Sequence, residues 1–194
     1  MRYQGGPHLT IQIILKPQGL RSLLGLDARL LRNGILALSE LPGAPRLGRL
    51  LAAPTALAKT DLLLRYLMAK AAHTTTRDTL VEHALQLVED QIEDLRLPRI
   101  LHALGVSERQ LERRFTLAVG VAPKTYLRVR RFNEALRLMK TRRHPTLASI
   151  AYALSFADQS HFIRDLKAFA QVTPKSLSER AEQFHEQAGI SYED

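Results

Sequence analysis

Two short stretches of the chain place side chains that could hydrogen-bond to nucleic-acid bases directly after a helix-capping residue. Ser107 precedes Arg109 and Arg113, and Asp158 precedes Arg164. Arg pairs with guanine, Gln pairs with adenine, and an exposed Ile suits the methyl group of thymine. Because Ser and Asp are preferred N-caps, each stretch predicts a helix whose first turns carry these side chains. The candidate base-reading residues are Arg109, Glu112, Arg113, Gln159, Ser160, His161, Ile163 and Arg164.

The two stretches belong to an internal repeat. Residues 107–124 and 158–175 align without a gap at an offset of 51. Leu111 and Phe115 give the first copy an apolar i, i+4 stripe, and the second copy has apolar residues at the same places. Each copy therefore predicts a capped amphipathic helix, a short turn and a new helix that begins at a proline. A helical solenoid is the alternative, but two copies are too few to build one.

A short helix is expected in front of each capped helix, over Leu97–Leu104 and Leu147–Leu154, and the second capped helix should end near Phe169. A short helix, a tight turn and a capped helix form a helix-turn-helix motif, whose second helix lies in the major groove of DNA. A long helix from Pro123 to about Thr141 joins the motifs. It spans roughly 30 Å, which is close to one duplex turn of about 34 Å. The spacing predicts recognition helices in two consecutive major grooves.

The charge of the chain favours a polyanionic partner. The formal net charge is +9, and residues 96–175 hold sixteen Lys and Arg against five Asp and Glu, whereas acidic residues dominate from Ser176 onward. A basic block of this kind indicates nucleic acid. Acidic membrane lipid is the alternative, but membrane-bound basic helices usually carry Trp or Phe on the apolar face, and this chain has no Trp. We expect phosphate contacts from Lys124, Arg128, Arg130, Lys167 and Lys175.

Several classes of chemistry find no support in the sequence. The chain has no cysteine, which excludes disulfides, thiolate zinc sites and cysteine nucleophiles. Its seven histidines are scattered without an i, i+4 pair, so we expect no metal site. No GxSxG, phosphate-loop or HExxH motif is present, so we expect no catalytic residue, no cofactor and no enzyme activity. No apolar run approaches a membrane span and no signal-peptide pattern is visible, so we expect no membrane association and a cytoplasmic location.

The N-terminal part differs in composition, because seven of the ten glycines and five of the nine prolines lie in residues 1–54. Leu9–Lys16 begins with alternating apolar and polar residues and predicts one β-strand. A lone strand must pair with another chain, pack on helices or be the remnant of a larger sheet. We expect helices at Leu20–Leu24, Leu47–Ala52 and Thr55–Ala72.

The polar segment His73–Arg77 is the expected domain boundary. It separates an N-terminal region, residues 1–75, from a DNA-binding region, residues 76–194. The expected fold class is mainly α, with a double helix-turn-helix domain preceded by a small α+β region.

Residues 97–180 resemble the DNA-binding domain of the AraC/XylS family of bacterial transcription regulators. The resemblance is carried by LGVSERQLERRF, GVAPKTYLRVRRFNEALRLM and LSFADQSHFIRDLKAFAQVTPKSL. The last stretch is the most specific, because the order and spacing of its residues follow the family signature. The resemblance implies seven helices, of which the first is Thr79–Gln91 and the last begins at Pro174, and it implies base reading by the residues named above.

The sequence departs from the family pattern at four places. Ser155 stands where the family usually has Gly before Phe156, and Gln171 replaces another usual Gly. Leu166 and Leu177 stand where aromatic residues are typical. Each departure bears on a local turn or on packing, and not on the fold.

Residues 1–75 also resemble the end of a sensor domain attached to such regulators, with a terminal strand, a KPxGL turn and a helical bundle. The strands that would close a ligand-binding barrel are missing, so we expect either a fragment of a longer regulator or a regulator without an enclosed effector pocket. A free strand edge predicts a homodimer.

These observations predict a sequence-specific double-stranded DNA-binding transcription regulator that touches or blocks RNA polymerase. The alternative is an architectural DNA-binding protein with weak sequence preference. An RNA-binding or membrane-surface protein would need aromatic stacking platforms or a basic amphipathic helix with exposed apolar residues, and neither is visible.

Overall fold

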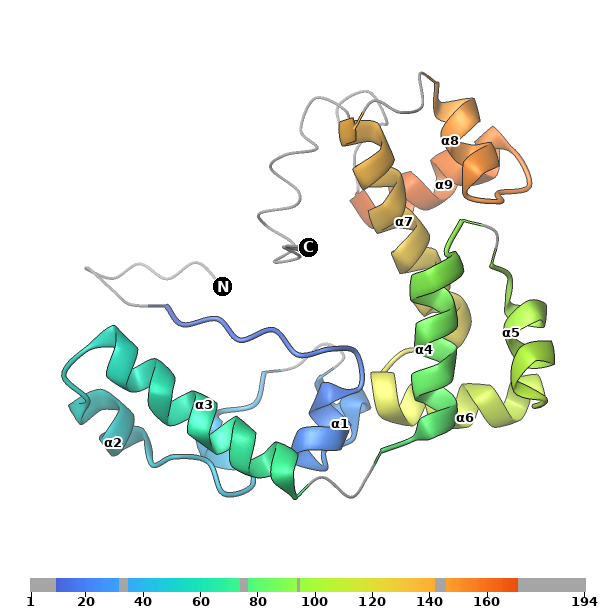
Figure 1. Ribbon diagram of the computed structural model, residues 1–194. Coiled ribbons are helices and arrows are strands. Elements are labelled where there is room, and N and C mark those ends of the chain that lie inside the picture. The colour runs from blue at the N-terminus through green and yellow to red at the C-terminus, as the bar shows by residue number, and fades with distance from the viewer. Residues whose placement is uncertain (1–9, 32–34, 74–76, 94, 142–145, 171–194) are drawn as a thin grey trace. The chain divides into compact units, whose positions relative to one another are not determined.

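The computed structural model describes residues 10–31, 35–73, 77–93, 95–141 and 146–170, and the regular elements in these ranges are all helical (Figure 1). The mainly α expectation is therefore confirmed. The chain divides into two compact units, Met1–Asp78 with Leu117–Gly120, and Thr79–Thr116 with Val121–Asp194.

The first unit contains α1 (Gly19–Leu24), α2 (Leu47–Ala52), α3 (Ala56–Ala72) and two 3-10 turns at Ala28–Leu31 and Leu38–Glu40. The second unit contains α4 (Thr79–Gln91), α5 (Leu97–Leu104), most of α6 (Glu108–Val119), α7 (Pro123–Thr141), α8 (Leu147–Ala153) and α9 (Gln159–Ala170).

The strand expected over Leu9–Lys16 is not present in residues 10–16, the part of it that the structure describes. A strand needs a neighbour to complete its backbone hydrogen bonds, and the described residues of this unit form helices and irregular segments instead. Ile13 and Ile14 are exposed. The strand prediction is wrong for these residues, and the α+β description of the N-terminal region is not confirmed.

Helix α3 begins one residue after the expected start, because Thr55 is its N-cap. The Oγ1 atom of Thr55 accepts a hydrogen bond of 3.1 Å from the backbone N–H of Ala58. None of its residues is buried, and Leu57, Leu64 and Met68 are exposed. Their i, i+7 and i+11 spacing places these three apolar side chains on one face of the helix.

The first helix-turn-helix motif consists of α5 and α6. The turn begins at Gly105, whose φ of 62° is left-handed, and the Val106 N–H donates to the carbonyl of Leu101 at 3.2 Å. This bond is typical of a Schellman motif, which ends a helix at a left-handed residue. Ser107 then caps α6, because its Oγ accepts a hydrogen bond of 3.3 Å from the Gln110 N–H.

The second motif, α8 and α9, has the same turn chemistry with one residue more. Ser155 takes the left-handed position, with φ of 54°, and the Phe156 N–H donates to the carbonyl of Ala151 at 3.0 Å. Asp158 caps α9 by accepting a hydrogen bond of 2.7 Å from the His161 N–H. Glycine is favoured at a left-handed position because it has no Cβ, so Ser155 is a strained choice at this turn.

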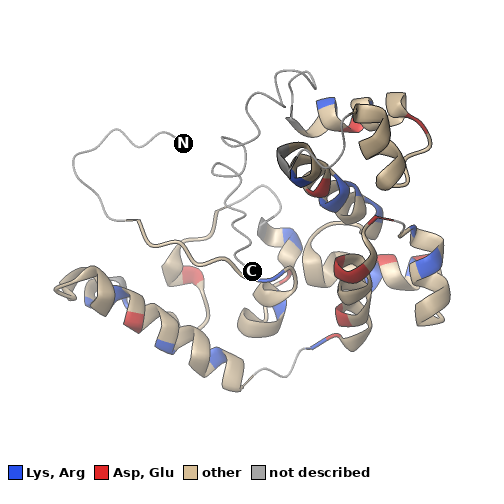
Figure 2. Cartoon of the chain, turned by 45° about the horizontal axis from the view of Figure 1, so that its top comes forward, with Lys and Arg blue, Asp and Glu red and all other residues tan. Residues whose placement is uncertain are grey.

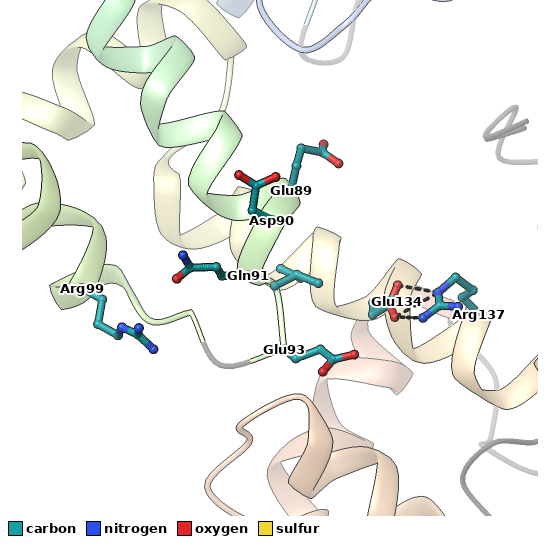
Figure 3. Close-up of a pocket in the computed structure, with 8 residues that line it drawn as sticks. Glu89, Asp90, Gln91, Glu93, Arg99, Glu134 and Arg137 are labelled. Carbon is teal, nitrogen blue, oxygen red and sulfur yellow. Dashed lines mark hydrogen bonds and ion pairs between the residues drawn. The ribbon is translucent and has the colours of Figure 1, made fainter. Parts of the chain in front are cut away.

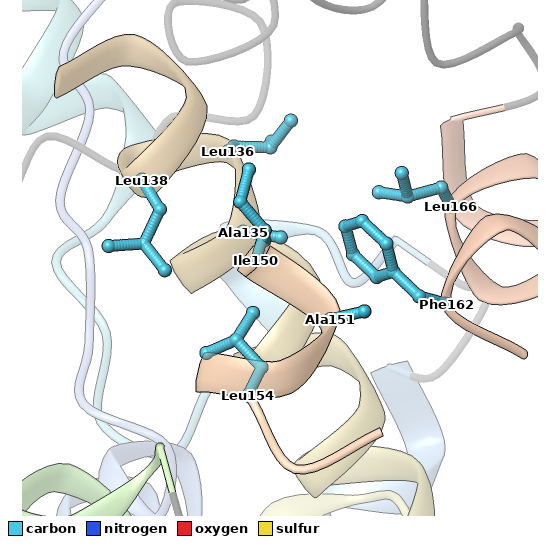
Figure 4. Close-up of a cluster of buried hydrophobic side chains, with 8 residues drawn as sticks. All are labelled: Ala135, Leu136, Leu138, Ile150, Ala151, Leu154, Phe162 and Leu166. Carbon is cyan, nitrogen blue, oxygen red and sulfur yellow. The ribbon is translucent and has the colours of Figure 1, made fainter. Parts of the chain in front are cut away.

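Helix α7 joins the motifs (Figure 1). Its side chains contribute to two apolar cores. Tyr126 and Leu127, near its beginning, are buried, and the ring of Tyr126 lies 5.4 Å edge-on from that of Phe115 in α6. Its C-terminal half packs against the second motif, where Phe162 and Leu166 of α9 point towards α7 and α8 (Figure 4). The second core consists of Ala135, Leu136, Leu138, Ile150, Ala151, Leu154, Phe162 and Leu166.

Leu166 fills the position of a typical aromatic residue as a fully buried core side chain. Gln171, Leu177 and the helix expected from Pro174 lie outside the described residues.

Candidate nucleic-acid interface

The N-terminal half of α6 presents its candidate base-reading side chains to solvent. Arg109, Glu112 and Arg113 are all exposed, while Leu111 and Phe115 on the opposite face are buried. The exposed side chains line a shallow hollow together with the capping residue. This face can therefore approach a DNA groove without any change in the helix.

Helix α9 presents a second set of polar side chains. Gln159, Ser160, His161 and Arg164 are exposed, and Ile163 is half-buried. The half-burial leaves Ile163 with part of its side chain accessible, as a contact with a thymine methyl group would need.

A basic hollow lies between the two motifs, along the N-terminal half of α7. It is lined by Lys124 and Arg128 of α7, by Arg96 before α5, and by Phe156 and His161 of the second motif. Figure 2 shows Lys and Arg on successive turns of α7. A hollow that gathers cations attracts a polyanion, because their fields add in the concave surface.

Arg128 is held in this hollow by a buried carboxylate of α9. Its Nε and terminal nitrogen donate to Asp165 at 3.2 and 2.7 Å, and the Asp165 side chain is only 10% exposed whereas that of Arg128 is 46% exposed. The guanidinium also lies 5.3 Å from the ring centroid of Phe169. The hydrogen bonds to Asp165 raise the pKa of Arg128 above its ordinary value, although partial burial lowers it.

Lys124 pairs with the first residue of α6. Its Nζ lies 2.7 Å from a carboxylate oxygen of Glu108, and both side chains are well exposed. The hydrogen bond to Glu108 raises the pKa of Lys124 above its ordinary value. An exposed ion pair contributes little stability, so Lys124 can exchange Glu108 for a phosphate at small cost.

The other expected phosphate contacts differ in their surroundings. Lys167 is exposed on α9. The Arg130 side chain is only 15% exposed and lies 2.7 Å from Glu89 of α4. Arg130 would have to leave Glu89 to reach a phosphate. Lys175 lies outside the described residues.

Arg131 and Arg96 also line this hollow. From the sequence, the cluster of Arg128, Arg130 and Arg131 is interpreted equally as a phosphate clamp and as a solvated face, and Arg96 is not among the expected contacts. Arg131 donates to the carbonyl of Leu95, and Arg96 donates to the carbonyl of Ser155 at 3.5 Å. Burial and the nearby charge of Arg96 lower the pKa of Arg131 from its ordinary value. Partners 36 and 59 residues away leave no mark in a local sequence pattern.

An acidic pocket lies at the end of α4 (Figure 3). It is lined by Glu89, Asp90 and Glu93, by Arg99, and by the Glu134–Arg137 ion pair of α7, among others. Its carboxylates outnumber its guanidinium groups, so it repels phosphate. The pocket therefore does not extend the candidate interface.

Within the part of the chain that the structure describes, no three His, Cys, Asp or Glu side chains gather as a metal site would need. No helix of these residues is long and apolar enough to cross a membrane.

A protein family matches the part of the chain that holds the two motifs. Residues 100–180 match a family described as "Helix-turn-helix domain". This region begins within α5 and includes the whole of α6 and α9. A search of curated proteins gives no significant match.

Three solved structures are similar. A transcriptional regulator from Chromobacterium violaceum, described by its AraC-type DNA-binding domain, is 29% identical, with 54% of this chain and 94% of that chain covered and a TM-score of 0.48. The C-terminal domain of the response regulator yesN from Fusobacterium nucleatum is 24% identical, with 52% and 99% covered and a TM-score of 0.48. Apo ToxT from Vibrio cholerae is 19% identical, with 85% and 68% covered and a TM-score of 0.43.

Proposed function

We propose that this protein is an AraC-type transcription regulator that binds double-stranded DNA sequence-specifically and reads two successive major grooves. The match of residues 100–180 to a helix-turn-helix family supports this proposal. The observation that carries the proposal is the presence of two capped recognition helices, α6 and α9, in one compact unit. Helix α7, with 19 residues, spans about 28 Å, which approaches the separation of two major grooves on one face of the duplex.

The base-reading role falls on the exposed polar residues at the start of α6 and α9, together with Ile163. Arg113 and Arg164 are matched positions of the repeat, and a bidentate Arg–guanine pair is the commonest specific contact. Phosphates between the two grooves would enter the basic hollow, where Lys124 and Arg128 already face solvent. Lys167, Arg130 and Lys175 complete the proposed phosphate contacts.

The test is selection of bound duplexes from a random pool, followed by footprinting of the selected site. Engagement of both motifs gives a protected region of about two turns, roughly 20 base pairs. Protection confined to half a turn contradicts two-groove reading. A small ratio of specific to non-specific affinity, measured at one salt concentration, favours the architectural alternative instead.

The salt dependence separates phosphate contacts from base contacts. Lys167→Ala should weaken binding to all sequences alike and reduce the slope of log affinity against log salt by about one. Arg130→Ala is the variant to compare with Lys167→Ala, because Arg130 is paired with Glu89 in the structure. An unchanged salt slope in Arg130→Ala removes this residue from the phosphate contacts.

We propose further that the protein acts in the cytoplasm, contacts or blocks RNA polymerase at a promoter, and has no enzyme activity. We also propose a homodimer. Because residues 10–16 do not form the expected strand, we place its interface on α3. The support is the apolar face of Leu57, Leu64 and Met68, which is exposed in the described residues. Sedimentation of the full chain at micromolar concentration tests the dimer, and a monomer contradicts it.

A further inference from the structure

The two apolar cores of the second unit meet opposite ends of α7, and the helix between them carries charged side chains. Tyr126 and Leu127 are buried near its beginning, and the first fully buried residue of the second core is Ala135, with Phe132 packed against that core. Arg128 and Arg131 lie between these points. Apolar packing therefore holds each motif to its own end of α7, and polar contacts at the middle of the helix connect the motifs to each other.

Arg131 is a side chain of α7 that reaches both motifs. Its guanidinium donates to the carbonyl of Leu95, at the entrance to α5, and lies 5.9 Å from the ring centroid of Phe156, in the turn of the second motif. The Arg96 side chain reaches across the same gap to the carbonyl of Ser155. By contrast, Arg128 bonds to Asp165 and thus connects α7 with the second motif alone.

The burial of Arg131 is poorly explained by stability. Its Nε is buried and has no hydrogen-bond partner among the described residues. An unsatisfied buried N–H and a partly desolvated charge both disfavour folding, and an apolar side chain of similar volume is often neutral or stabilising at such a place. A guanidinium offers what an apolar side chain lacks, a directional bond to a carbonyl together with stacking on an aromatic ring.

We propose that Arg131 is a positioning residue that locks α6 and α9 in one relative orientation, so that the protein accepts one spacing and one helical phase between its two half-sites. This inference rests on the proposed function, because it assumes that both motifs read DNA. The partner is a bipartite duplex whose half-sites have a fixed separation. Arg131 determines which half-site spacing is bound by fixing the angle between the motifs, and this role needs no contact with a base.

The first test needs no DNA. The chain contains no cysteine, so Gln110→Cys on α6 and Ala168→Cys on α9, both exposed positions, give two unique spin-label sites in the full chain. Pulsed dipolar spectroscopy then measures the distribution of distances between the motifs. We expect a narrow distribution with Arg131, a broad one with Arg131→Met, and a narrow one with the control Arg137→Met. Arg137 also lies on α7 but pairs with Glu134 of the same helix.

The second test measures how the affinity for DNA depends on the spacing of the half-sites. Sequences selected by the unlabelled protein define the two half-sites, and one base pair is then inserted between them. Insertion turns the half-sites by about a tenth of a turn, and we expect affinity to fall about tenfold, as for a mismatched base pair. In Arg131→Met the same insertion should cost less than about threefold. The cost is taken as the ratio of affinities with and without the insertion within each variant, so a uniform loss of affinity from the removed charge cancels. Arg137→Met should keep the full penalty.

The outcomes separate the two proposals. If selection yields no bipartite motif, the proposed two-groove function fails. If the motif is bipartite and Arg131→Met keeps both the narrow distance distribution and the full insertion penalty, the positioning role is overturned and the function stands. Should Arg131→Met fail to fold by circular dichroism, the double variant Arg96→Gln, Phe156→Leu removes the contacts on the side of the second motif. It is expected to broaden the distribution, and a narrow one overturns the proposal.

Discussion

The two helix-turn-helix motifs share a left-handed turn and a side-chain N-cap, but they differ in the residue that takes the left-handed conformation. Both turns are left-handed at one residue and both recognition helices are capped by a side-chain oxygen. The first turn uses Gly105, and the second uses Ser155 and is one residue longer. The residue after the left-handed position is Val106 in the first turn and Phe156 in the second, and the ring of Phe156 lies 5.6 Å from that of His161 and 5.1 Å from that of Phe162. The second motif thus accepts backbone strain and gains an aromatic cluster beside Arg131.

The recognition faces also differ in charge. The exposed start of α6 carries Glu108 and Glu112 among its arginines, whereas the exposed start of α9 carries mainly neutral hydrogen-bonding side chains. The acidic residues on α6 can accept a hydrogen bond from cytosine but repel phosphate. The two motifs are therefore expected to read different half-sites.

The largest expected effect comes from removing the central aromatic residue of either core. Phe115 and Phe162 are both fully buried, so Phe115→Ala and Phe162→Ala should each cost about 3–5 kcal/mol of unfolding free energy. Urea unfolding followed by circular dichroism measures both. A single shifted transition in each variant shows that the motifs unfold together, and a second transition confined to one motif shows that their cores are independent.

Arg113 and Arg164 occupy equivalent positions in the two copies of the repeat, so their removal tests whether both motifs read bases. Arg113→Ala and Arg164→Ala should each cost about 1–3 kcal/mol of binding free energy and relax base preference at one position, in different half-sites. Selection from a random duplex pool with each variant measures this. A selected motif that is unchanged in Arg164→Ala would remove that residue from the base-reading set.

The caps should matter to a smaller and similar degree. Ser107→Ala and Asp158→Ala each remove one hydrogen bond to the first turn of a recognition helix, at a cost of about 1 kcal/mol in unfolding free energy. Asp158→Ala should cost more, because a carboxylate at a helix N-terminus also interacts favourably with the helix dipole. Thermal unfolding of both variants at low ionic strength ranks the two, and the opposite order contradicts this reasoning.

The smallest effect is expected from exchanging the two turn residues. Ser155→Gly should stabilise the protein by up to about 1 kcal/mol, because glycine relieves the left-handed strain, and Gly105→Ser should destabilise it by a similar amount. An added Cβ at Gly105 meets nothing within 4 Å, so the second change reports backbone strain alone. Loss of stability in Ser155→Gly, measured by urea unfolding, would show that the Ser155 side chain contributes more than its strain costs.

Local structure followed closely from the sequence. The bounds expected for the helices Leu97–Leu104 and Pro123–Thr141 agree with α5 and α7, and Ser107 and Asp158 act as the caps that their types predict. The unusual residue Ser155 marks a place where the backbone is left-handed. These features depend on residues at most four or five apart, so their signals are present in the sequence.

The sequence by itself determined the helices, their caps and the exposed faces of α6 and α9, because helical periodicity and capping are local properties of the chain. Only the tertiary structure decided which partner each arginine of α7 contacts. Arg128, Arg130 and Arg131 are near neighbours on one helix, yet they meet Asp165, Glu89 and the Leu95 carbonyl, partners between 36 and 41 residues away. The missing strand in residues 10–16 has the same cause. A β-strand needs a neighbouring strand, just as an ion pair needs a second charge, and a local sequence pattern does not show whether that neighbour is present.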